Sequence, residues 1–88
     1  MKIFLIKNTD VQGYCWGQFV DAVVVAVDEE AARKMHPGGD DGNVPEGKEF
    51  SDSWASSPER VCVRYLGEAA ESIVDPWVVT AYLVGEAD

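Results

Sequence analysis

Hydrophobic residues gather in four short segments of the chain, and the pattern within each segment predicts a β-strand. Residues 2–7 (KIFLIK) are rich in β-forming residues and end at the polar stretch Asn8-Thr9-Asp10, as a first strand would. Residues 19–27 are almost wholly Val, Ala and Phe, and such a continuous apolar run is typical of a central strand or one buried on both faces. Residues 61–66 alternate between two faces, and residues 77–84 (WVVTAYLV) form the last apolar run. The alternation predicts a half-buried strand in which Cys62 is a small core residue.

The segment after the second predicted strand has the signals of a short helix. Asp28 is suited to cap its N-terminus, and the acidic residues 29–30 favour the positive end of the helix dipole. The basic residues 33–34 suit its last turn, and His36-Pro37-Gly38-Gly39 ends it. We therefore expect a helix of about two turns that depends on packing against a sheet.

Residues 37–58 show little periodicity and are crowded with Gly, Asp and Pro, so they predict a long exposed loop. Loops of this length are uncommon in compact domains and are often functional. The predicted order is β-β-α-loop-β-β within a single domain, residues 1–88. Because the connections inside each strand pair are short, we expect two antiparallel hairpins. The expected fold class is α+β, a four-stranded, mostly antiparallel sheet with one short helix on a face.

Composition narrows the classes of function. The chain has 88 residues, of which 47% are hydrophobic, and it carries a net charge of −9. This charge opposes direct binding to nucleic acid or to an anionic membrane, and it favours cationic partners. No apolar stretch is long enough to span a bilayer, and the first residues lack a signal-peptide core. We expect a cytoplasmic protein whose two cysteines, Cys15 and Cys62, are reduced.

Residues that could carry catalysis are scarce. His36 is the one histidine and has no second histidine or cysteine pair at ligand spacing, so no metal site is predicted. A nucleophilic pair would require Cys15 or Cys62 to approach His36 in space. The glycine-rich stretch GGDDG places two acids where a bound phosphate would lie. The sequence predicts neither an enzyme nor a cofactor.

Two groups of residues are candidates for binding a partner. Carboxylates on the predicted loop could meet a basic surface, although the acidity could equally serve solubility alone. Tyr14 and Trp16 lie on a glycine-flanked connection, and with Phe50 they are candidate aromatic anchors, unless they fold back as a lid. Trp54 is expected to be a plug beneath the loop. The predicted partner-binding residues are Tyr14, Trp16, Asp40, Asp41, Glu46, Glu49, Phe50 and Asp52.

The stretches GYCWGQFVDAVVVAVDEEAARKMHP and WASSPERVCVRYLGEA, with the closing hydrophobic strand, resemble a family of small uncharacterised acidic proteins encoded by bacteriophages and prophages. The likeness covers most of the chain, but its motifs describe fold more than chemistry. The chain departs from the family pattern at Cys15-Trp16-Gly17 and in its VTAYLVGEAD ending. The resemblance implies a phage-linked accessory role in a bacterial host cell and supplies no activity.

Three hypotheses follow from these features. The first is a binding inhibitor, similar in action to an anti-CRISPR protein, whose acids occupy the basic nucleic-acid-binding surface of a host nucleoprotein or nuclease. The second is a non-catalytic accessory module without an inhibitory role, either a subunit of another assembly or a self-associating component such as a homodimer. The third is a minor enzyme or ligand-binding protein that uses the loop as a lid.

Overall fold

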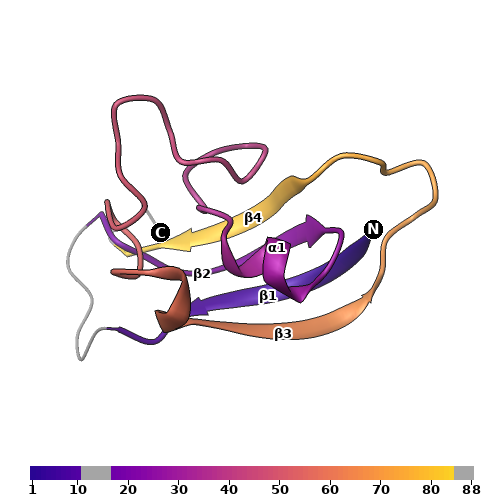
Figure 1. Ribbon diagram of the computed structural model, residues 1–88, viewed down its shortest axis with the longest axis horizontal. Coiled ribbons are helices and arrows are strands. Elements are labelled where there is room, and N and C mark those ends of the chain that lie inside the picture. Colours follow the sequence, from indigo (N-terminus) through magenta and orange to yellow (C-terminus); the bar gives the residue numbers. More distant parts are fainter. Residues whose placement is uncertain (11–16, 85–88) are drawn as a thin grey trace.

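The computed structural model describes residues 1–10 and 17–84 as one antiparallel sheet with a short helix on one face (Figure 1). The elements are β1 (Lys2–Asn8), β2 (Phe19–Ala26), α1 (Glu29–Arg33), the 3-10 turn η1 (Pro58–Arg60), β3 (Val61–Glu68) and β4 (Trp77–Leu83). The predicted α+β fold class and the predicted order of elements are confirmed.

The strands are arranged in the order β3-β1-β2-β4, and every neighbouring pair is antiparallel. β1 and β2 form the predicted hairpin, and β2 is a central strand as its apolar run indicated. The predicted hairpin of β3 with β4 is wrong, because these strands occupy opposite edges of the sheet. The segment 69–76 spans the end of the sheet between them (Figure 1). β1 and β2 hydrogen-bond to each other along their facing edges. β3 therefore pairs with the outer edge of β1, and β4 pairs with the outer edge of β2.

The core lies on one face of the sheet, beneath α1 and the segment that follows it. Alternate residues of the strands enter this face; the buried cluster contains Phe4, Ile6, Ala22, Val24, Ala26, Ala32, Met35, Trp54, Ala55 and Val61. Trp54 is buried as expected, and Phe50 packs partly against the cluster. The loop is therefore part of the core's cover, which accounts for its aromatic content.

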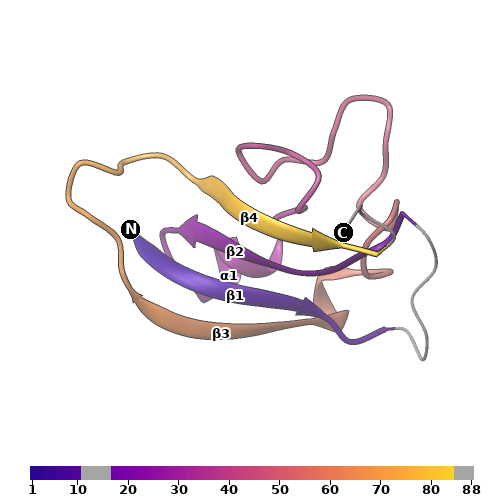
Figure 2. The ribbon, with the colours of Figure 1, turned by 180° about the vertical axis from the view of Figure 1, so that it is seen from behind.

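The opposite face of the sheet has a different character. Figure 2 shows the four strands in front of α1, and no described helix lies on this side. Val25 is only 1% exposed but is not part of the main cluster, since its alternation directs it to this second face. Cys62 also lies here and is exposed. The expectation that Cys62 is a core residue is thus wrong, because Val61 and Val63 take the inward positions of β3.

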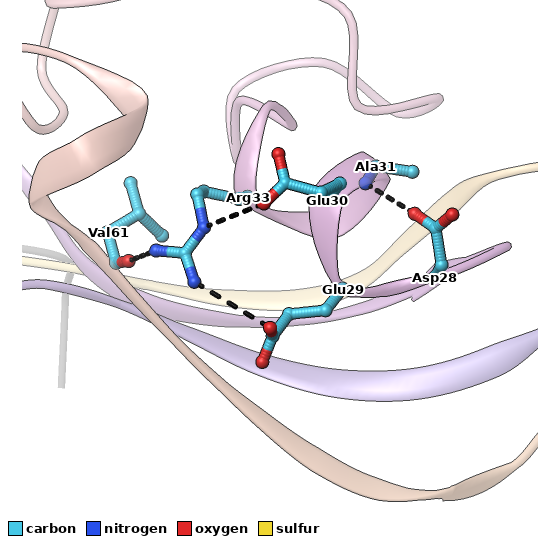
Figure 3. Close-up of polar contacts among 6 residues, drawn as sticks. All are labelled: Asp28, Glu29, Glu30, Ala31, Arg33 and Val61. Atoms are coloured by element: carbon cyan, nitrogen blue, oxygen red, sulfur yellow. Dashed lines mark hydrogen bonds and ion pairs between the residues drawn. The ribbon is translucent and has the colours of Figure 1, made fainter.

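α1 begins as the sequence predicts and is tied to the sheet by one arginine. The Ala31 amide donates to Oδ1 of Asp28 at 2.8 Å, which satisfies one of the free amides of the first turn. Arg33 donates to the Val61 carbonyl at 2.5 Å, which joins the end of α1 to the start of β3 (Figure 3). Its guanidinium also lies 4.0 Å from Glu29 and 3.8 Å from Glu30. The helix spans five residues, so these links and the burial of its inner face hold it in place.

Within the described residues, no helix is both long enough and apolar enough to cross a membrane.

Candidate functional site

The loop after α1 is organised around the buried side chain of His36. The Gly38 amide donates to Nδ1 of His36 at 2.9 Å, and Nε2 lies 2.7 Å from the Asp52 carbonyl. An amide can only donate and a carbonyl can only accept, so the ring is neutral and carries its proton on Nε2. One imidazole thereby fixes both ends of the segment between residues 38 and 52.

Two phenylalanine rings pack edge-on against this imidazole. The ring centroid of Phe19 lies 6.2 Å from that of His36, and the ring centroid of Phe50 lies 6.1 Å from the same imidazole. Burial lowers the pKa of His36, while the carbonyl and the charge of Asp52 oppose that shift. The structure therefore gives Phe50 a packing role within the loop, and the function proposed below does not use Phe50 as an anchor.

Close packing of glycines also fixes the first half of the loop. The His36 amide donates to the Gly42 carbonyl at 2.7 Å. Gly42 has a φ of +86°, and a Cβ at this position would lie 2.4 Å from Cε of Met35. A Cβ at Gly39 would lie 2.1 Å from the Asn43 carbonyl oxygen. The backbone thus approaches its neighbours at distances that only glycine permits.

Two of the five candidate carboxylates have structural roles within the loop. Asp41 accepts from the amide of Asn43 at 2.9 Å and from its Nδ2 at 2.8 Å. These bonds lower the pKa of the Asp41 carboxyl. Asp52 accepts from the Glu49 amide at 2.8 Å. Both are exposed, but each holds a turn as well as displaying a charge.

The other three carboxylates, those of Asp40, Glu46 and Glu49, are exposed, and no described residue pairs with them through its side chain. The backbone beneath Asp40 is anchored, because its carbonyl accepts from the Val78 amide at 2.8 Å. The backbone that carries these acids is therefore held in place by hydrogen bonds to the rest of the fold.

The structure divides the candidate acids between two places. Asp40 and Asp41 line a shallow depression of about 370 Å³ together with residues 72–77. Asp52 lines a second depression of about 340 Å³, beside Lys48 and His36. Glu46 and Glu49 belong to neither. The loop therefore presents a dispersed acidic surface instead of one carboxylate cluster.

The predicted aromatic anchors Tyr14 and Trp16 lie outside the described residues. Trp77 begins the last strand and is not among the residues predicted to bind a partner. It is 46% exposed and lines the same depression as Asp40 and Asp41. Its position at the start of a strand, one residue before the inward-facing Val78, is the signal that could have identified it.

The described residues offer no assembled catalytic group. Both nitrogens of His36 are already engaged on the covered face, whereas Cys62 lies on the other face of the sheet. Within residues 1–10 and 17–84, no three His, Cys, Asp or Glu side chains are grouped to hold a metal ion.

Comparison with protein-family models, with curated proteins and with solved structures found no match to the chain.

Proposed function

We propose that the chain is a non-catalytic, acidic binding protein that engages a cationic protein surface through its 40–52 loop. The observation that carries the proposal is the bracing of this loop, whose exposed carboxylates stand on backbone held by His36, Gly42 and the amide of Val78. A preorganised surface loses less conformational entropy on binding than a flexible one. Carboxylates arranged in this way steer a basic partner and speed its association.

In its specific form, the proposal is that a phage-linked protein occupies the basic nucleic-acid-binding surface of a bacterial defence nucleoprotein or nuclease. The negative charge and the resemblance of the sequence to phage and prophage proteins motivate this choice of partner. Inhibition would then arise from competition with nucleic acid for one basic groove. The chain needs no chemistry of its own for this action.

The test begins with an affinity pull-down from bacterial lysate and continues with surface plasmon resonance on the captured protein. Reversal of Glu46 and Glu49 to Lys should slow association at least tenfold at low salt and flatten its salt dependence. The matched control reverses Glu30 and Glu59, which are exposed acids away from both the loop and residues 68–77, and changes net charge by the same amount. If both double variants weaken binding equally, overall charge rather than this loop governs association, and the proposal fails.

Asp41 and Asp52 are unsuitable for the first experiment because their carboxylates accept hydrogen bonds that hold the loop. Asp40 offers a third reversal, since its side chain is exposed while its carbonyl makes the anchoring contact. Loss of nucleic-acid binding by the captured partner, measured in the same assay, would link association to inhibition.

The second candidate function is a self-associating accessory module. The observation that favours it is the face of the sheet opposite α1, on which no described helix lies.

A further inference from the structure

The face of the sheet opposite α1 is apolar at its centre and carries charges at one end. We call it the open face (Figure 2). By strand alternation and register it comprises Ile3, Leu5, Lys7, Asp21, Val23, Val25, Cys62, Arg64, Leu66, Trp77, Thr80 and Tyr82. Trp77 is 46% exposed, Leu66 50% and Tyr82 59%. These exposed side chains lie on the two edge strands, whereas Ile3, Leu5 and Val23 between them are half-buried and Val25 is 1% exposed. Large exposed apolar side chains on one face of a sheet commonly mark an interface.

The charges on the open face are few, and no residue that the structure describes forms an ion pair with them. Lys7 and Asp21 are directly opposite each other on β1 and β2, and Arg64 is opposite Leu5 on the neighbouring strand pair. The ion pairs among the described residues use other cations, Arg33 and Arg60. The two cations lie on β1 and β3, on one side of the sheet's midline, and Asp21 lies on β2, on the other side.

We infer that the open face binds a second copy of this chain, with a two-fold axis parallel to the strands. Such an axis lays β1 over β2 of the other copy and β3 over β4, at the same level along the strands. Lys7 and Asp21 share a level, so each Lys7 meets Asp21 of the second copy, twice by symmetry. An axis perpendicular to the strands would stack each strand on itself and would leave both charges unpaired.

The shape of the face fits the same arrangement. Ile3 pairs with Gly67 on one side, and its β2 partner, Val25, pairs with Trp77 on the other. The two-fold axis therefore places each Trp77 over Gly67 of the second copy. A Cβ built at Gly67 would meet nothing within 4 Å, so this position leaves space for an indole. At the next level, Arg64 meets the hydroxyl-bearing Thr80.

The twist of packed sheets is compatible with these contacts. Aligned sheets pack about 10 Å apart with their strands about 30° from parallel. Two residues from the centre, that angle displaces a side chain by roughly 3–4 Å. A lysine side chain spans this displacement easily, so the Lys7–Asp21 contact survives realistic packing.

The area of the face sets the expected strength. Four strands about 4.8 Å apart and seven residues of about 3.3 Å give about 450 Å² in plan for each copy. With side-chain relief, the pair reaches the lower end of the roughly 1,200–2,000 Å² typical of specific interfaces. We therefore expect a dimer that forms at micromolar concentration. This inference does not use the carboxylates of the 40–52 loop, and its test measures self-association alone, although Trp77 at the edge of the open face also lines the depression that contains Asp40 and Asp41.

The test is a charge exchange followed by analytical ultracentrifugation between about 1 and 500 µM. The wild-type protein should sediment at twice the chain mass of 9.6 kDa at high concentration. Lys7→Glu and Asp21→Lys should each weaken dimerisation more than tenfold, since each places like charges opposite one another. Trp77→Ala should do the same by removing the knob over Gly67.

A mixture of the Lys7→Glu and Asp21→Lys variants provides the decisive measurement. In the mixed dimer, Glu at position 7 of one copy meets Lys at position 21 of the other, and Lys7 meets Asp21. Two proteins that are each monomeric should therefore form a heterodimer when combined, which a mere loss of folding could not produce. A wild-type protein that remains monomeric at 500 µM would overturn the inference, as would single variants that stay dimeric or a mixture that stays monomeric.

Discussion

Replacing His36 with Phe tests whether the imidazole braces the loop. The substitution keeps a ring of similar volume between Phe19 and Phe50, but it removes the bonds to the Gly38 amide and the Asp52 carbonyl. Each such bond contributes about 0.5–1.5 kcal/mol net, so the free energy of unfolding should fall by about 2 kcal/mol. For a domain of this size, that corresponds to a drop in Tm of about 8–16 °C.

The same histidine predicts how stability depends on pH. Because its folded-state pKa lies below the ordinary value of 6.5, the unfolded chain binds more protons as the pH falls below that value. The stabilisation from neutral His36 is therefore complete above about pH 6.5 and is lost as the pH falls toward the depressed pKa. Lys48 and Asp52 line the depression beside the His36 ring, and they are the charged groups of that depression that face its protonation.

Urea denaturation followed by tryptophan fluorescence, at intervals from pH 7.5 to 4.5, measures both effects. The wild-type protein should lose stability as the pH falls below about 6.5, and the Phe variant should have a flatter pH dependence there. Asp10 and Asp41 also have lowered pKa values, but their contributions are lost only below the ordinary carboxyl value of 3.8. Equal midpoints for the two proteins at pH 7.5, or a wild-type curve that is flat from pH 7.5 to 5, would refute the proposed role of His36.

Five further substitutions, in three tests, examine the packing by denaturation. Gly42→Ala should destabilise by about 1–3 kcal/mol more than Gly47→Ala, because both have positive φ but only Gly42 lies against a methionine side chain; equal losses would contradict this. Val25→Ala should reduce stability by about 1–2 kcal/mol, whereas Val79→Ala, at a position 42% exposed, should change it by less than about 0.5 kcal/mol. Cys62→Ser should be similarly neutral, since Cys62 is exposed; a large loss would indicate a buried or bonded thiol.

Local features of the fold could be predicted because their causes lie within a few residues. The apolar run of β2, the alternation of β3 and the Asp28 cap each follow from spacing alone. The β1–β2 hairpin could be predicted, but the pairing of β3 with β1 could not, because these strands are more than fifty positions apart in the sequence. Alternation also does not say which face is covered, and for this reason Cys62 was expected in the core.

The candidate site shows the same division between local and distant causes. Exposure of the loop acids followed from composition, whereas the hydrogen bond from the Glu49 amide to Asp52 depends on a turn that the sequence did not specify. The role of His36 was missed because its partners, Gly38 and Asp52, are separated along the chain and meet only when the loop closes. An acid that holds a turn and one that only displays charge have the same signature in sequence.

The two proposed surfaces together restrict how a complex could be built. If two open faces pack together about the inferred two-fold axis, β4 of each copy lies over β3 of the other, so the two 40–52 loops, each hydrogen-bonded to β4 through Val78, lie at opposite edges of the dimer. One dimer could not then place both loops on a single flat basic patch, so it would gain no avidity there. It would instead bridge two basic partners, and the complex would contain two copies of each protein. A charge variant that prevents dimerisation, such as Lys7→Glu, should therefore convert this complex to one copy of each while leaving the affinity of an individual loop unchanged.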